Sequence, residues 1–170
     1  MTAGIRIRAM AEGDLEKVEK IQRKCFSDPW SKEGLRESLG LSRTIWLVLE
    51  AEWGEDIALI GCAGMYTVLD EGEIVSVAVD PDARRKGYGR ALVSRLLKEG
   101  ACRGVRRAYL EVRVSNEAGK GLYRSLGFAS CGIRKGFYEH PPEDAQVMYR
   151  EVFPAISTGG QTEKECIIKS

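Results

Sequence analysis

Three basic residues and two glycines occur together in one short segment, Arg84-Arg85-Lys86-Gly87-Tyr88-Gly89. It lies between a strand-like stretch, residues 73–79, and a stretch with helical spacing of apolar residues, about 87–101. The first turn of a helix leaves backbone N–H groups unpaired and carries partial positive charge, and glycine lets a ligand approach the backbone closely. This combination favours a phosphate or diphosphate site. A basic turn with convenient glycines, or a nucleic-acid contact, fits the same residues.

Counting excludes two common phosphate-binding motifs. Walker A requires G-x-x-x-x-G-K-[ST], which does not occur in the sequence. The dinucleotide fingerprint requires glycine or alanine where Leu92 stands. What remains is R-x-x-G-x-G, which by itself does not separate a cofactor loop from an ordinary basic turn.

Two residues further along have types suited to acid–base chemistry. Glu111 alternates with Leu110 and Val112, so its carboxylate points away from an apolar face, and partial burial would raise its pKa towards the range of a general base. Tyr123 follows Asn116 by two helical turns and faces the same side. The alternatives are a solvent-facing glutamate paired with Arg113 or with a neighbouring strand, and a tyrosine packed in the core.

Composition excludes several classes of function. The 170 residues carry a net charge of +1, so no chain-wide basic excess indicates a nucleic-acid partner. Five cysteines without a C-x-x-C pair and a single histidine, His140, lack zinc-finger spacing, and we expect no metal. No apolar run is long enough to span a bilayer and the first residues lack the pattern of a secretory signal. We therefore expect a cytoplasmic protein that acts without a membrane.

Periodicity indicates one mixed α/β (α+β) domain over residues 1–155, followed by a flexible tail over 156–170. Strands are expected over residues 5–9, 44–50, 58–69, 73–79, 107–114, 128–134 and 146–152, the last two joined by a loop over 135–145. Helices are expected after caps at Asp14 and Ser31, over about 87–101, and from Asn116 to Gly127. The strands over 73–79 and 107–114 should be parallel, joined by a right-handed crossover.

Four segments in register resemble one family. These are F-S-D-P-W-S (26–31), V-A-V-D-P-D-A-R-R-K-G-Y-G-R-A-L (77–92), L-E-V-R-V-S-N-E-A-G-K-G-L-Y-R-S-L-G-F (110–128) and F-Y-E-H-P-P-E-D-A-Q-V-M (137–148). They resemble the GCN5-related N-acetyltransferase (GNAT) superfamily, and within it the bacterial ribosomal-protein alanine N-acetyltransferases of the RimI type. The resemblance implies a mixed sheet of about seven strands, splayed between the fourth and fifth, with about four helices on its faces.

The resemblance also implies a cosubstrate, acetyl-CoA, and its contacts. The pantetheine arm would pair with the backbone of the fourth strand, the first of the two strands that splay apart. The diphosphate would bind the backbone amides of the loop that follows this strand. The residues concerned are Val77, Ala78, Val79, Arg84, Arg85, Lys86, Gly87, Tyr88, Gly89 and Arg90, with Asn116 on the next helix. Gly119 and Gly121 depart from the alanine-like residues usual in that helix, at a cost of roughly 1–2 kcal/mol.

By the same resemblance Glu111 is the general base and Tyr123 the general acid. Trp30, Phe137 and Tyr138 would line the acceptor slot, whose expected occupant is a protein N-terminus of the ribosomal alanine type. Lysine side chains or a small-molecule amine remain alternative acceptors, and a non-catalytic acyl-CoA-binding module is an alternative of another class. We expect a monomer or weak dimer that does not bind nucleic acid directly.

Overall fold

The computed structural model describes residues 4–152, and the predicted tail over 156–170 lies outside this range. The described residues form seven strands and four α-helices, as expected. In chain order they are β1 (Gly4–Ala9), α1 (Leu15–Cys25), α2 (Lys32–Leu39), β2 (Thr44–Trp53), β3 (Asp56–Val68), β4 (Glu71–Val79), α3 (Tyr88–Cys102), β5 (Arg107–Arg113), α4 (Glu117–Ser125), β6 (Ala129–Glu139) and β7 (Pro142–Glu151). None of the described helices is long and apolar enough to cross a membrane.

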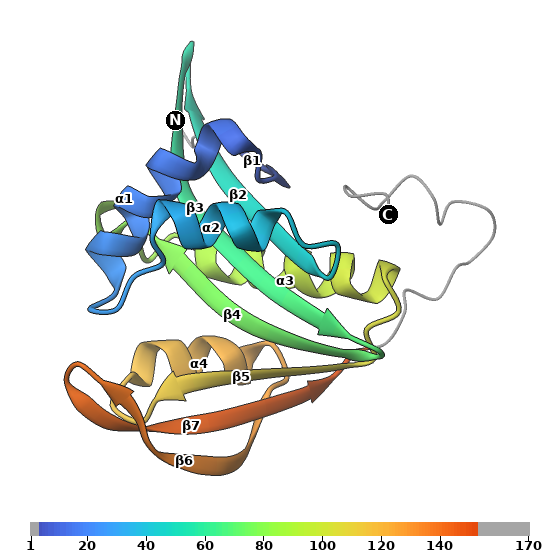
Figure 1. The fold of residues 1–170 in the computed structure, drawn as a ribbon. Helices are drawn as coiled ribbons and strands as arrows, with labels where there is room; N and C mark the ends of the chain where they lie inside the picture. The colour runs from blue at the N-terminus through green and yellow to red at the C-terminus, as the bar shows by residue number, and fades with distance from the viewer. Residues whose placement is uncertain (1–3, 153–170) are drawn as a thin grey trace.

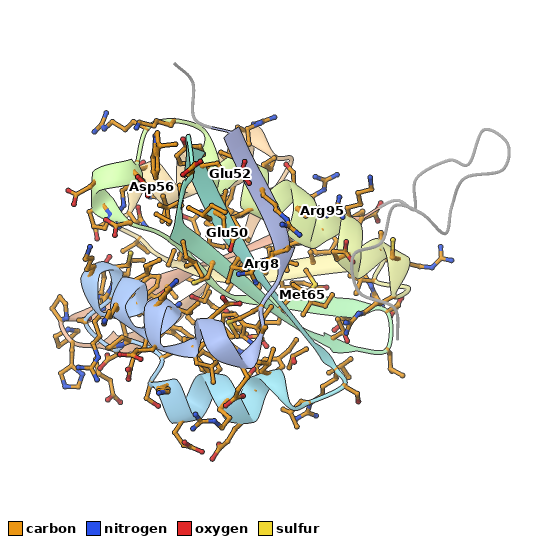
Figure 2. All side chains as sticks on the ribbon, turned by 90° about the horizontal axis from the view of Figure 1, so that it is seen from above. Arg8, Glu50, Glu52, Asp56, Met65 and Arg95 are labelled. Carbon is orange, nitrogen blue, oxygen red and sulfur yellow. The ribbon has the colours of Figure 1, made fainter. Side chains whose placement is uncertain are left out.

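One mixed sheet separates two apolar cores (Figure 1). Its order is β1-β2-β3-β4-β5-β7-β6. Side chains alternate across β2, so Trp46 and Val48 face α1 and α2, whereas Leu47 and Leu49 face α3. Figure 2 shows α1 and α2 on one side of the strands and α3 on the other. The helices therefore cover both faces of the β1–β4 half of the sheet.

The parallel ladder between β4 and β5 is short. It pairs four positions, from Glu71 with Arg107 to Ile74 with Leu110, and then the two strands diverge (Figure 1). β4 stays paired with β3 as far as Val79, and β5 stays paired with β7 along its whole length. The register between β3 and β4 shifts here, leaving Val75 as an extra residue on β4. The predicted splay between the fourth and fifth strands is thus confirmed.

The last hairpin differs from the prediction. Residues 135–145 were expected to form a loop, but β6 and β7 extend through most of them and only His140 and Pro141 connect the strands. Gly136 adopts a left-handed conformation (φ +64°), which accommodates an irregular stretch between Arg134 and Tyr138 without ending β6. Phe137 and Tyr138 consequently stand on a strand.

Asp14 does not cap α1 as the sequence suggested. Its carboxylate accepts a hydrogen bond from the Ala11 amide (2.8 Å) and binds Arg8 of β1 at 2.7 Å. The Arg8 guanidinium also binds Glu50 of β2 at 2.6 Å, and Figure 2 shows both of these side chains on neighbouring strands. Arg8 holds the pKa of Asp14 below its ordinary value of 3.8, because the hydrogen bonds favour the charged carboxylate.

We predict that Asp14→Asn lowers the free energy of unfolding by about 1 kcal/mol at neutral pH, since the ion pair is only partly buried. A carboxylate whose folded pKa is lowered stabilises the fold above its unfolded pKa, and this contribution disappears as the pH falls. The variant should therefore lose less stability than the wild type below about pH 4 in urea titrations. Asp56→Asn, an exposed change at the start of β3, is the control; equal acid sensitivity in Asp14→Asn and wild type would contradict the assignment.

Candidate active site

A cleft of about 550 Å³ opens where β4 and β5 separate. Its walls come from the end of α1 and the loop that follows, from β4 and β5, from α4, and from β6. Seven of the residues singled out from the sequence line it: Trp30, Val77, Glu111, Asn116, Tyr123, Phe137 and Tyr138. The structure therefore brings together residues that lie more than 100 positions apart in the chain.

The β4 wall offers unpaired backbone. Past Ile74, β4 has no partner on its β5 side. The Asp80 amide donates to Ile60 of β3 (2.8 Å), and because backbone groups alternate in direction along a strand, those of Val79 and Val77 point towards the opening. Ala78 is buried against the α1 side. This half of β4 is a strand edge that can accept another extended chain.

The loop after β4 leads into α3 through two left-handed residues, Arg85 (φ +63°) and Gly87 (φ +80°). A Cβ built on Gly87 meets nothing within 4 Å, so backbone conformation rather than crowding favours glycine there. The first amides of α3 follow directly, starting at Tyr88. The expected loop residues 84–90 are thus adjacent to the exposed part of β4, although none of them lines the cleft itself.

The basic side chains of this loop divide into two groups. Arg84 turns back to the strand: its Nε donates to the Val79 carbonyl at 3.1 Å and its Nη2 reaches Cys25 Sγ at 3.4 Å. Arg90 donates to Ser125 Oγ at 2.8 Å and ties α3 to α4. Arg85 and Lys86 are exposed. Only these last two extend freely from the loop.

Glu111 is a half-buried carboxylate on the cleft side of β5. Its side chain is 13% exposed, and its Oε1 lies 2.9 Å from Arg134 Nη1. Burial raises the pKa of Glu111 above the ordinary value of 4.5, the nearby Glu73 carboxylate raises it further, and Arg134 opposes both effects. The paired alternative weighed from the sequence named Arg113 or a neighbouring strand; the partner is Arg134 of β6, one strand beyond the neighbour of β5.

Tyr123 lies on α4 and packs edge-to-face on Phe128, with ring centroids 5.8 Å apart. Burial raises the pKa of its phenol, and Tyr138 adds to the effect, so the hydroxyl keeps its proton at neutral pH. Within residues 4–152 that hydroxyl makes no hydrogen bond, and the residue lines the cleft. It is placed to donate a proton to a group bound there.

Asn116 caps α4, as predicted: its Oδ1 accepts from the Gly119 amide at 2.8 Å. A Cβ on Gly119 would lie 2.7 Å from the Asn116 amide nitrogen, whereas a Cβ on Gly121 would meet nothing within 4 Å. Gly119 is therefore required by the close approach of the cap, and nothing in the structure explains Gly121.

The part of the cleft predicted to take the acceptor is aromatic. Trp30 packs edge-to-face on Trp46 at 5.4 Å, and Phe137 does so on Tyr138 at 5.0 Å. Arg113 lies over the Tyr138 ring at 4.2 Å and donates to the carbonyls of His140 and Pro141 at 3.0 and 2.9 Å. This arginine, which lines the cleft, also fixes the turn of the hairpin.

Sequence reasoning missed three charged groups of the site: Glu73, Arg113 and Arg134. Glu73 was detectable, because it pairs with Tyr109 in the β4–β5 ladder and alternation puts its side chain on the same face as Glu111. Arg134 gave no signal, since it reaches Glu111 from a strand that is not adjacent to β5.

Comparison with known proteins decides the family. Residues 15–128 match the model of the acetyltransferase (GNAT) family. The chain belongs to the GNAT acetyltransferase family. It is 37% identical over 144 residues to the [ribosomal protein bS18]-alanine N-acetyltransferase of Salmonella typhimurium, covering 84% of this chain and 94% of that protein.

Solved GNAT structures agree. The crystal structure of the ribosomal-protein-S18-alanine N-acetyltransferase from Escherichia coli matches with a TM-score of 0.77 and 32% identity, over 93% of this chain and 97% of that one. Spermidine N-acetyltransferase from Vibrio cholerae, in complex with CoA and spermine, matches with a TM-score of 0.72 at 22% identity, over 87% and 95% of the two chains. At that identity the likeness shows the shared fold and says nothing of the acceptor.

We predict opposite effects for two alanine substitutions in α4. Gly119→Ala displaces the Asn116 cap and should lower the free energy of unfolding by about 1 kcal/mol, whereas Gly121→Ala should raise it by up to about 1 kcal/mol through helix propensity. Chemical denaturation of both variants checks this matched pair. Equal stabilisation by the two substitutions would show that the cap contributes nothing.

Proposed function

We propose that this protein transfers the acetyl group of acetyl-CoA directly, in a ternary complex, to the N-terminal α-amine of a ribosomal protein of the alanine type. The observation that carries the proposal is that Glu111 and Tyr123 line the same cleft. They are a carboxylate and a phenol whose pKa values are both raised. The alanine N-acetyltransferases that resemble this chain over 84% or more of its length support the choice of acceptor.

The residues present fit acetyl-CoA. The free backbone of β4 at Val77, with the amide of Val79, suits an amide-rich pantetheine arm, and Ala78 between them keeps the strand anchored in the core. The Val79 carbonyl is already bound by Arg84. The amides from Arg85 to Arg90 suit the diphosphate, with Arg85 and Lys86 adding positive charge and Tyr88 and Gly89 forming the first turn of α3. When bound, acetyl-CoA supplies the thioester carbonyl that an amine attacks.

The protein's own groups would manage the two protons of the reaction. An amine must be neutral to attack, so Glu111 takes a proton from the acceptor ammonium, directly or through water. Tyr123 donates its phenolic proton to the departing CoA thiolate, and it regains a proton from the attacking nitrogen, which loses its second proton as the amide forms. Asn116 holds the start of α4 and thereby the position of Tyr123 two turns later.

The acceptor side suits the end of an extended peptide. Trp30, Phe137 and Tyr138 form its aromatic walls, and Tyr138 can hydrogen-bond the peptide backbone. We propose that residues 1–155 act as a single cytoplasmic domain, as a monomer or weak dimer, on a protein partner without nucleic acid or membrane. A non-catalytic acyl-CoA-binding module would have no use for Glu111 and Tyr123 in one cleft.

We predict that Glu111→Gln lowers kcat about a hundredfold or more with little change in the KM for acetyl-CoA. Because the carboxylate must be ionised to accept a proton, wild-type activity falls as the pH drops through the raised pKa of Glu111, and this acidic limb should vanish in the variant. Glu139→Gln, an exposed change on β6, is the control. An acidic limb retained by Glu111→Gln would remove Glu111 as the base.

We predict that a peptide beginning with alanine and carrying an internal lysine is acetylated at its α-amine. Mass spectrometry of three forms tests this: the free peptide, the same peptide with a blocked N-terminus, and the free peptide with lysine replaced by arginine. The first and third should be modified equally, and the second should not react. Labelling of the blocked peptide, or faster acetylation of spermidine than of any peptide, would favour the lysine or small-amine alternatives.

A further inference from the structure

Arg134 of β6 covers the carboxylate on which the proposed reaction depends. Its Nη1 lies 2.9 Å from Glu111 Oε1, and its side chain is 59% exposed whereas that of Glu111 is 13% exposed. A solvent-exposed guanidinium therefore neutralises a carboxylate that is largely removed from water.

The charges that face Glu111 come from each element around it. Glu73 approaches from β4, Arg134 and Tyr138 from β6, and Tyr123 from α4. Burial and Glu73 favour the protonated form of Glu111, and Arg134 is the cation that favours the ionised form. Without Arg134 the buried carboxylate would face a second carboxylate with no counter-ion.

An acceptor amine competes for the same place. An unperturbed α-amine has a pKa of about 7.7–8.0 and arrives largely as an ammonium ion at neutral pH. To pass a proton to Glu111 it must come within hydrogen-bond distance of that carboxylate. Because Arg134 already binds Oε1, the guanidinium and the ammonium would meet at one carboxylate, where their like charges repel.

The surroundings of Arg134 allow it to move away. It sits on the edge strand of the sheet, where the β6–β7 register breaks between Arg134 and Tyr138. Its guanidinium carbon also lies 5.6 Å from the centre of the Phe137 ring, a contact that does not depend on Glu111. The side chain can leave Glu111 without disturbing the core.

We propose that Arg134 is a positioning residue that serves as the exchangeable counter-ion of Glu111: it holds the carboxylate between turnovers and yields it to the acceptor's α-ammonium. This inference rests on the proposed role of Glu111 as base. After the ammonium proton has passed to Glu111 and the amine has become a neutral amide, the proton leaves to solvent and Arg134 re-pairs with the carboxylate. The uncharged product has no cation with which to compete, which favours its release.

Arg134→Gln tests the proposal through a split between KM and kcat. Above the acidic limb, the KM for a free-amine peptide should fall about two- to fivefold, the range typical of an exposed ion pair, with little change in kcat. The acidic limb of kcat/KM should move to higher pH, because the lost cation lowered the pKa of Glu111. The affinity for the N-acetylated peptide, which carries no ammonium, should not improve.

Lys135→Gln is the matched control, since it removes the same charge from the next residue of β6, and thermal melts of both variants verify folding. A raised KM in Arg134→Gln would mean that Arg134 binds the acceptor itself. An unchanged KM and pH profile would mean that the ion pair affects neither acceptor binding nor Glu111. Either result overturns the proposal. If Glu111→Gln retains the acidic limb, the assignment of the base fails instead. If Glu111→Gln loses the limb but Arg134→Gln does not shift it, only the present inference fails.

Discussion

The ladder between β4 and β5 stops after Ile74 and Leu110, and the rest of the site follows from that early end. Each strand remains paired on its other side, β4 with β3 and β5 with β7, so the sheet stays whole while its middle opens. Backbone groups in protein interiors need partners, and those freed on β4 face a cleft in which a ligand or water can provide them. An unpaired strand edge is usually a liability, but here it lies in the cleft to which the proposal assigns acetyl-CoA.

The opened half of β4 is held by the last turns of α1, which also form one wall of the cleft. Gln22 donates to Ser76 Oγ at 2.7 Å, Cys25 Sγ lies 3.3 Å from the Val79 carbonyl, and Lys24 binds Asp80 at 2.7 Å. These contacts fix β4 through side chains and its final carbonyl, and they leave the cleft-facing backbone at Val77 available. β4 is therefore held firmly in place while its backbone at Val77 keeps its hydrogen-bonding groups free for a ligand.

Electrostatics in the cleft act differently on Glu111 and Tyr123, the two groups proposed to transfer protons. Burial acts on both Glu111 and Tyr123, but it keeps the phenol protonated while it brings the carboxylate towards the pH range of a base. Arg134 limits the second effect, and Arg113, two residues from Glu111, is occupied with the hairpin turn and Tyr138. The two arginines thus differ in effect: Arg134 lowers the pKa of Glu111, whereas Arg113 holds the hairpin turn and the Tyr138 ring in place.

The sequence by itself determined the family resemblance, the number and order of most strands and helices, the caps at Ser31 and Asn116, and the side of β5 on which Glu111 stands. These follow from local rules, because alternation, helical spacing and capping depend on residues within a few positions of one another. Tertiary structure decided what depends on distant segments: the pairing of Arg134 with Glu111, the use of Asp14 by Arg8, and the continuation of β6 and β7 through residues read as a loop. Judged by its glycine and prolines alone, the stretch over 135–145 is a turn. In the folded chain β6 pairs with β7 across the bulge at Gly136, and this pairing gives the backbone more hydrogen-bond partners than a loop would. Only the tertiary structure brings the two strands together.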